Sequence, residues 1–348
     1  MKLRIVSTAA VFLAILGIAG RQSHPGPAGA DQATRPGTVS ASKTAAATDG
    51  GKPDSVSKIA ATDGPRDYAP WKRPPQEIQL KAHPVAVAPV IDGRADDAAW
   101  KAAPSITTLD YSSQRPINVK SVVTATDIFF LVTYAKDKPA ETHKTWIWDP
   151  KERVYREGHD REDVFVFKWS MSGNDLELKL RDPEPHRADI WYWKAHRTNP
   201  SGYADDKWQG VSLKGGNDAK KIKDNGASAL YLRRVGDAGT AAFDEKFFFE
   251  YKGDRAEKYV PQPPVGSRAD VRAKGVWAKG QWTIEFARKL DTHHDDDQPF
   301  APGGTYLFGV SLYEMAYGTP QPELSQPLYR TGDVFDRILL TIPRSAGK

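Results

Sequence analysis

Cysteine is absent from this chain of 348 residues. Its absence excludes disulfides, thiolate metal sites, covalent attachment of a c-type haem through a Cys-x-x-Cys-His motif, and a lipid anchor on an N-terminal cysteine. Dense basic clusters are missing as well, because the 49 Lys and Arg residues are scattered among 44 Asp and Glu residues. A nucleic-acid groove requires a basic stripe or patch, so we expect no nucleic-acid partner.

The N-terminus carries a charged and then an apolar segment. Lys2 and Arg4 precede an apolar stretch at residues 5–19, which is too short for a comfortable membrane span. This order is typical of a secretory signal peptide, which we predict over residues 1–30. The alternative is an uncleaved segment that anchors the protein to a membrane. Both alternatives predict a periplasmic or otherwise exported protein.

Residues 31–75 have almost no aliphatic bulk and consist largely of Ala, Thr, Ser, Gly, Pro, Lys and Asp. Such a segment cannot bury enough apolar surface to offset the entropy lost on ordering. We therefore predict a disordered low-complexity linker. Within it, residues 43–50 are echoed by residues 58–64, which we interpret as a slipped duplication.

The remaining residues, 76–348, are rich in aromatic and turn-forming residues, and we predict one all-β domain there. Two hairpins stand out: residues 119–125 with 128–135, and residues 276–277 with 282–288 around a Lys-Gly turn. We also expect a short strand at residues 176–180. Short strands at close spacing, without long helices, favour a β-sandwich.

Two segments carry the aromatic residues that we expect to form a site. In residues 164–171 a period of two puts Val164, Val166, Lys168 and Ser170 on one face, and Phe165, Phe167, Trp169 and Met171 on the other. Residues 189–206 contain Trp191, Tyr192 and Trp193, followed by the basic residues Lys194, His196 and Arg197. We interpret the two segments as the two walls of a pocket.

Four groups of residues, taken together, resemble a known family. They are Ile91-Asp92-Gly93 with Asp97 and Trp100, the acidic run at residues 160–163, the stretch at residues 189–206, and Trp282 with Arg288-Lys289-Leu290. This combination resembles the ethylbenzene dehydrogenase-type haem-binding domain, which is similar to the haem-b gamma subunits of the dimethyl sulfoxide reductase class. The resemblance spans roughly residues 84–343.

The resemblance implies a β-sandwich related to the family-nine carbohydrate-binding modules that holds one haem b non-covalently outside the cytoplasm. It also implies a cytochrome-like electron-transfer or redox-accessory role rather than an enzyme. The redox partner would be a molybdenum oxidoreductase or a c-type cytochrome. In the gamma subunits a methionine and a lysine hold the iron, and Met171 is the position that we match to the methionine.

The chain departs from the family pattern at two places. Tyr192 stands between the tryptophans, where relatives often carry histidine, and residues 320–325 offer neither lysine nor histidine where the second ligand would be sought. The second iron ligand is therefore unassigned, and Lys194, His196 and Met315 are the candidates. Trp191 and Trp193 are candidates for stacking on the porphyrin edge.

Alternatives from other classes remain open. Met171 is equally well interpreted as a core methionine that fills a gap. Trp191, Trp193 and Trp208 would form a sugar platform in a carbohydrate-binding module without haem. A weaker alternative is a structural or interaction protein whose tether reaches a membrane partner. We interpret residues 293–297, His-His-Asp-Asp-Asp, as a solvated loop rather than a metal site.

Overall fold

The computed structural model describes residues 71–180, 183–224, 229–315, 329–331 and 333–344. The predicted signal peptide and most of the predicted linker lie outside these residues, as do residues 320–325. Among the described residues, no helix combines the length and apolar character needed to cross a membrane.

Residues 71–75, which we place at the end of the linker, are among the described residues. The ring of Trp71 packs edge-on against Tyr111 and Phe335, with ring centroids 5.9 and 5.4 Å apart. The guanidinium of Arg73 makes two hydrogen bonds of 2.7 and 2.5 Å to the carboxylate of Asp336.

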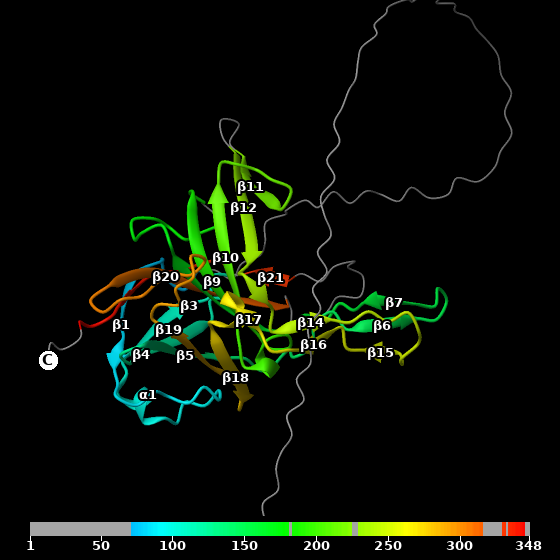
Figure 1. Cartoon of the computed structure of the whole chain (residues 1–348), viewed down its shortest axis with the longest axis horizontal. Coiled ribbons are helices and arrows are strands. Elements are labelled where there is room, and N and C mark those ends of the chain that lie inside the picture. The colour runs from blue at the N-terminus through cyan, green and yellow to red at the C-terminus, as the bar shows by residue number, and fades with distance from the viewer. Residues whose placement is uncertain (1–70, 181–182, 225–228, 316–328, 332, 345–348) are drawn as a thin grey trace, which may run out of the picture. The chain divides into compact units, whose positions relative to one another are not determined.

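Two large β-sheets pack face to face, which confirms the predicted β-sandwich (Figure 1). The larger sheet has the strand order β1-β22-β20-β8-β9-β10-β12-β11, with β21 paired to β20. Its strands are β1 (Glu77–Lys81), β8 (Val164–Ser170), β9 (His186–Lys194), β10 (Asp205–Ser212), β11 (Ala219–Asp224), β12 (Ala229–Gly236), β20 (Thr305–Met315), β21 (Tyr329–Thr331) and β22 (Arg337–Thr341).

The smaller sheet has the order β18-β19-β5-β4-β2, with β3 paired to β4. Its strands are β2 (His83–Pro84), β3 (Ser105–Leu109), β4 (Pro116–Val123), β5 (Asp127–Ala135), β18 (Arg272–Ala278) and β19 (Gln281–Lys289). Both predicted hairpins are confirmed, as β4 with β5 and as β18 with β19. In the turn of the second hairpin, φ is positive at two residues, 51° at Lys279 and 79° at Gly280. Gly280 adopts its angle without strain because it has no Cβ atom.

The core between the sheets is strongly aromatic because the inward faces of β8 and β9 supply rings in alternation. Phe167 and Trp169 stack with centroids 5.5 Å apart, and Trp169 stacks on Phe308 of β20 at 4.5 Å. Gly275 of β18 lies against the ring of Trp193, where a Cβ atom would meet the ring at 2.4 Å. A side chain at this position would push the two sheets apart.

Several small elements lie outside the two large sheets. Strands β6 (Trp146–Asp149), β7 (Val154–Glu157) and β15 (Arg255–Ala256) form a small sheet that projects from the sandwich (Figure 1). The other elements are α1 (Ala98–Ala102), η1 (Asn199–Ser201), η2 (Ser267–Ala269), β13 (Gly239–Thr240), β14 (Phe243–Glu245), β16 (Tyr259–Pro261) and β17 (Val265–Gly266).

The predicted strand at residues 176–180 is wrong, since this segment is irregular. Its leucines instead cover the face of the larger sheet that is turned away from the core, where Leu178 packs with Val166 and Ile190. Leucines at every second position fit any extended segment over an apolar surface, so the alternation alone did not identify a strand.

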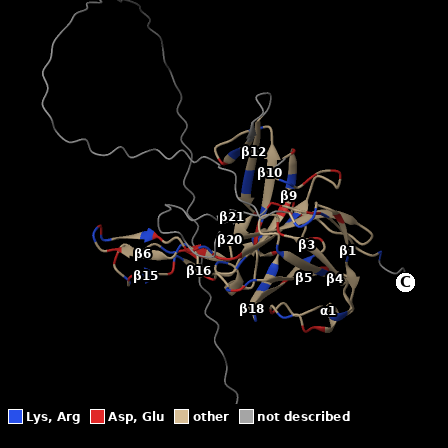
Figure 2. Cartoon of the chain, turned by 180° about the vertical axis from the view of Figure 1, so that it is seen from behind, with Lys and Arg blue, Asp and Glu red and all other residues tan. Residues whose placement is uncertain are grey.

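Lys and Arg are mixed with Asp and Glu over the described elements (Figure 2).

Candidate functional site

The two predicted pocket walls, residues 164–171 and 189–206, do not face each other. Strands β8 and β9 are neighbours in one sheet, and Phe165 lies opposite Trp193 while Phe167 lies opposite Trp191. These four rings point into the sandwich core, and Trp191 and Trp193 are 0% exposed. Neither tryptophan therefore offers a ring face to a porphyrin or a sugar in this structure, and both act in packing.

Met171 and Met315 lie at the ends of strands of the larger sheet. Met171 directly follows β8 and is half-buried, and its backbone N–H still pairs with the carbonyl of Arg187 at 2.9 Å. If the alternation of β8 continues, Met171 lies on the same face as Trp169, the core face. Met315 ends β20, and its side chain lies outside the described part of the structure.

Lys194 is buried in an ionic network on β9 and β10. Its Nζ pairs with the carboxylate of Asp205, which also pairs with Arg268 and, at 3.1 Å, with Lys207. These cations hold the pKa of the Asp205 carboxyl well below its usual range. Burial lowers the pKa of Lys194 to about 7, against the opposing effect of Asp205, and its Nζ is engaged with that carboxylate.

His196 lies apart from Lys194, at a second buried carboxylate. Its backbone N–H donates to Glu162 at 2.7 Å, and its ring Nδ1 is 3.0 Å from the carbonyl of Glu141. Glu162 also accepts from Arg197, through both the backbone N–H and the guanidinium. The acidic run at residues 160–163 thus anchors the loop after β9.

The structure brings together a different set of residues on the face of the larger sheet turned away from the core, here called the outer face. The strand register places Lys168 opposite Ile190, and Val166 opposite both Tyr192 and Ser311. These side chains line a cavity of about 10 Å³. Further lining comes from Leu180, Gln209, Arg234, Tyr313 and Val334.

Lys168 is the most unusual residue of the outer face, since a lysine rarely lies buried among apolar side chains. It is 6% exposed, and its Nζ donates to the carbonyl of Leu178 at 2.8 Å. Burial lowers the pKa of Lys168 to about 7, although the carboxylate of Asp333 acts in the opposite direction. At neutral pH a large share of this side chain is therefore a neutral amine.

His186 begins β9 and lies in the same alternation as Ile190 and Tyr192. Its ring is buried, with Nδ1 2.8 Å from the carbonyl of Glu184 and with no hydrogen-bond partner at Nε2. A carbonyl only accepts, so Nδ1 carries the proton and Nε2 carries the lone pair. Burial and the nearby Lys168 lower the pKa of His186 to about 4, which keeps the ring neutral at pH 7.

Tyr192 and Arg234 complete the outer face. Burial and the neighbouring Tyr313 raise the pKa of Tyr192 well above its usual value, and the two rings meet edge-on with centroids 5.9 Å apart. Tyr192 therefore stays a neutral phenol, which does not ligate iron as a phenolate would. The guanidinium of Arg234 donates to Gln209 at 2.9 Å and supplies a positive charge beside the tyrosines.

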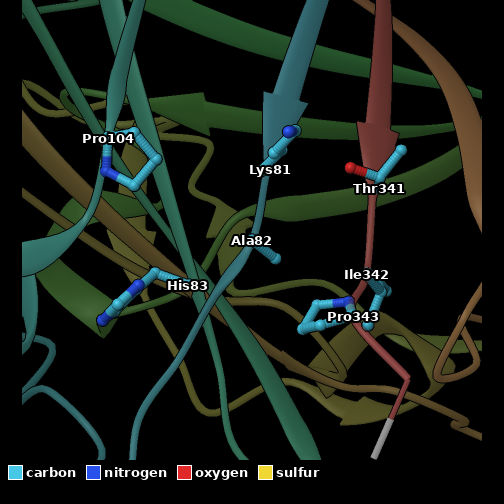
Figure 3. A pocket seen from close by; sticks show the side chains of 7 residues that line it. All are labelled: Lys81, Ala82, His83, Pro104, Thr341, Ile342 and Pro343. Carbon is cyan, nitrogen blue, oxygen red and sulfur yellow. The ribbon is translucent and has the colours of Figure 1, made fainter.

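A wider hollow of about 340 Å³ lies elsewhere, at the ends of β1 and β22. Figure 3 shows His83 and Pro104 on one side of Ala82, and Thr341 and Pro343 on the other. Its lining is mostly small and apolar, and it lacks the buried nitrogen donors that distinguish the outer face. We therefore take the outer face as the candidate site.

Sequence reasoning missed Lys168 and His186 as site residues, although a signal for each is present. Lys168 is the one charged residue in a run of apolar and small side chains, and His186 is in register with the alternation that leads to Tyr192. Trp191 and Trp193 are more prominent in the sequence because of their size, but they occupy core positions.

Comparison with known protein families matches residues 71–320 to the family described as ethylbenzene dehydrogenase. The chain belongs to the ethylbenzene dehydrogenase family. This confirms the resemblance found in the sequence at the level of the family. A comparison with curated proteins finds no match.

Solved structures similar to this ethylbenzene dehydrogenase-family chain include a putative carbohydrate-binding protein from Bacteroides uniformis. The two sequences are 10% identical, the TM-score is 0.35, and the match covers 77% of this chain and 99% of that one. A family 9 carbohydrate-binding module from Caldicellulosiruptor kristjanssonii in complex with cellotriose gives 12% identity, a TM-score of 0.35, and coverage of 78% and 96%. The same module in complex with glucose gives 11% identity, a TM-score of 0.35, and coverage of 78% and 99%. Similarity at this level says nothing about what this chain binds.

Proposed function

We propose that this protein is an exported, haem-b-binding electron-transfer domain that holds its haem against the outer face of the larger sheet. The observation that carries the proposal is the pair of buried nitrogen donors, His186 and Lys168, in a member of the ethylbenzene dehydrogenase family. Its role is that of an electron-transfer or redox-accessory domain and not of a catalyst.

The donors suit iron. The imidazole of His186 presents a lone pair at Nε2, and its Nδ1–H is fixed by the carbonyl of Glu184 at 2.8 Å. Metal-binding histidines commonly have this second hydrogen bond, which orients the ring and raises its basicity. Lys168, with a pKa lowered to about 7, offers an amine without the large cost of deprotonating an exposed lysine. We assign His186 as the first candidate iron ligand and Lys168 as the second.

The cavity on the outer face is too small for a haem, so haem binding requires a conformational change. The cavity measures about 10 Å³, whereas sites for cofactor-sized ligands are roughly 300–1,000 Å³. The segment that closes it is irregular, and Leu178 and Leu180 lie across the face. Haem binding therefore requires this segment to move off the sheet.

The charges around the cavity suit the periphery of a haem. Arg234 lies at the cavity, where a guanidinium would pair with a propionate. Val166, Ile190 and Val334 supply apolar surface for the ring.

The haem, when bound, supplies a one-electron couple between ferric and ferrous iron. The residues of the chain contribute by excluding water, by fixing the ligand tautomer at His186 Nδ1, and by keeping Tyr192 protonated so that it does not compete for iron. Electron exchange would take place with a redox protein outside the cytoplasm, such as a molybdenum oxidoreductase or a c-type cytochrome. Residues 1–30 would direct the export.

Met171 remains a proposed ligand from the sequence. It lies at the end of β8 rather than beside Tyr192, so ligation from Met171 would require a haem position near the end of that strand. Substitution of each residue separately distinguishes the two positions.

The sugar platform that would serve a carbohydrate-binding module is not formed by the described residues. Trp191 and Trp193 are in the core, and Trp208 is covered by the guanidinium groups of Arg187 and Arg233, which lie 5.0 and 5.3 Å from its ring centroid. We therefore do not favour this alternative.

Titration of haem b into the purified protein, followed by absorption spectroscopy, tests the proposed function. We expect a saturable Soret band at one haem per chain. Calorimetry with soluble β-glucans tests the alternative, and heat of binding from glucans without a Soret band would overturn the proposal.

A further inference from the structure

Four buried aspartates from four separate segments lie close together. Asp189 is on β9, Asp206 on β10, Asp237 directly after β12, and Asp297 in the loop between β19 and β20. One carboxylate oxygen from each of Asp189, Asp206 and Asp297 lies within 4.8 Å of the other two. Asp237 lies beside them, since its backbone N–H donates to the carbonyl of Asp206 at 3.3 Å. Burial and the charges of Asp189 and Asp297 raise the pKa of its carboxyl group.

Two guanidinium groups lie near these four carboxylates: that of Arg268, which pairs with Asp205 and acts to lower the pKa of Asp237, and that of Arg288. The guanidinium of Arg288, itself fully buried, pairs with Asp189 at 2.6 Å and lies 3.5 Å from Asp297. If all four carboxylates are ionised, three negative charges remain uncompensated by Arg288. Burying an unpaired carboxylate costs several kcal/mol, and burial and mutual repulsion raise the pKa of Asp206, Asp237 and Asp297, so either protons or a bound cation must compensate these charges.

Most of the carboxylate oxygens of the cluster are buried without a hydrogen bond, including both of Asp297 and one of Asp189. Both carboxylate oxygens of Asp206 are buried without a hydrogen bond, and the same holds for Asp237. The neighbouring Asp296 is different, because Ser267 Oγ donates to it at 2.8 Å and the backbone N–H of Ala238 at 3.1 Å. The fold thus supplies donors to a carboxylate one residue from Asp297 and none to Asp206.

We propose that Asp189, Asp206, Asp237 and Asp297 form a buried Ca²⁺ site. Calcium takes carboxylate oxygens at about 2.3–2.6 Å, so oxygens on opposite sides of the ion are about 4.6–5.2 Å apart, and the oxygens of Asp189, Asp206 and Asp297, within 4.8 Å of one another, fit this spacing. Magnesium retains several waters and suits a buried site less well, and zinc favours histidine and thiolate ligands, which these four residues do not provide.

This site corrects the interpretation of residues 293–297 as a solvated loop. His293 and Asp295 are exposed as expected, but Asp297 is 2% exposed and turns inward to the cluster. His294 pairs with Asp270, with 2.6 Å between Nδ1 and the carboxylate, and both lie within 4.8 Å of an oxygen of Asp297. A bound ion would tie this loop to strands β9 and β10 and to the end of β12, and so would stabilise the larger sheet independently of any haem.

Calorimetric titration of CaCl₂ into protein stripped with EGTA tests the proposal. We expect one Ca²⁺ per chain and a rise in Tm that grows with CaCl₂ concentration, since a ligand that binds the folded state stabilises it. MgCl₂ at the same concentration should give a smaller rise. No heat of binding and no change in Tm with CaCl₂ would overturn the proposal.

Asp206→Asn gives a more specific test because it removes charge without changing size. In EGTA this variant should have a higher Tm than the wild type, since it relieves repulsion, and its affinity for Ca²⁺ should fall by at least about tenfold. Asp295→Asn, an exposed change in the same loop, is the matched control and should behave as the wild type. A response to Ca²⁺ in Asp206→Asn equal to that of the wild type would contradict the site.

A measurement on the wild type alone covers the case in which Asp206→Asn fails to fold. Tb³⁺ replaces Ca²⁺ in oxygen sites and emits when a nearby indole is excited. Trp191 lies next to the cluster, because Arg288 contacts both its ring, at 4.9 Å from the centroid, and Asp189. We expect Tb³⁺ emission on tryptophan excitation that CaCl₂ abolishes by competition, and emission unaffected by CaCl₂ would contradict the proposal.

Discussion

The indole Nε1 of Trp100 donates to the buried carboxylate of Glu285 at 2.7 Å, and the backbone N–H groups of Asp92 and Gly93 donate to its other oxygen at 3.0 and 2.8 Å. Trp100, Asp92 and Gly93 belong to one of the sequence groups that carry the family resemblance, and Glu285 lies between Trp282 and Arg288 of another. Their contact attaches the segment before β3 to strand β19, so this part of the family pattern specifies the fold.

Trp100→Phe should destabilise the protein more at pH 8 than at pH 5. Burial raises the pKa of Glu285 to about 7, so its carboxylate is ionised at pH 8 and protonated at pH 5. A hydrogen bond to a charged group contributes about 1.5–3 kcal/mol, compared with about 1 kcal/mol for a neutral one. Urea denaturation at the two pH values measures the difference.

Trp277→Phe is the control for this comparison, because the indole of Trp277 donates to a neutral carbonyl, that of Lys136, at 2.7 Å. Its cost should be the same at both pH values. A cost of Trp100→Phe that does not change with pH would show that Glu285 does not change its protonation state between pH 5 and pH 8.

Lys168→Leu should remove a pH dependence of stability. The folded-state pKa of Lys168 is about 7 and the usual value is 10.5, so between these pH values the unfolded chain binds the proton that the folded chain has lost. Stability of the haem-free wild type should therefore rise from pH 7 to pH 10, by about 1.4 kcal/mol per unit of pKa difference at most. The variant should lose this component of the rise.

Urea denaturation at pH 7 and pH 10 compares the wild type with Lys168→Leu. Lys101→Leu, an exposed change on α1, should retain the full slope. An equal slope in Lys168→Leu would mean that the amine of Lys168 is charged in the folded protein.

Trp193→Ala should cost about 3–5 kcal/mol of unfolding free energy, because it opens a cavity in the sandwich core beside Trp282, whose ring centroid is 4.8 Å away. Trp208→Ala should cost less, since it removes mainly contacts with two arginines that contribute about 0.5–1 kcal/mol each. Thermal or urea unfolding gives both values. Similar small costs for the two substitutions would place Trp193 at a surface instead.

The sequence was informative about the fold because alternation and turns are local properties. The hairpin of β4 and β5 and the strand β8 follow directly from runs of apolar residues and the turn between them. The site was harder to predict, because both faces of β8 are buried and alternation alone does not tell which of them faces the core. Lys168 and His186 acquire their properties from residues distant in sequence, such as Asp333, that lie over the same face.

His186→Leu should alter the absorption spectrum of the haem-reconstituted protein, since it removes the proposed iron ligand. Lys168→Leu should shift the spectrum if the amine holds the second position. Met171→Leu keeps the size of the side chain and should leave the spectrum unchanged. A spectrum changed by Met171→Leu and unchanged by His186→Leu would move the haem to the end of β8.

The central claim is that the outer face holds one haem b, and the absorption spectrum of the purified protein during haem titration tests it most directly. The account predicts a Soret band that saturates at one haem per chain, with the pyridine haemochrome spectrum of haem b. A band that grows in proportion to added haem without saturation, or that is absent, would contradict the claim.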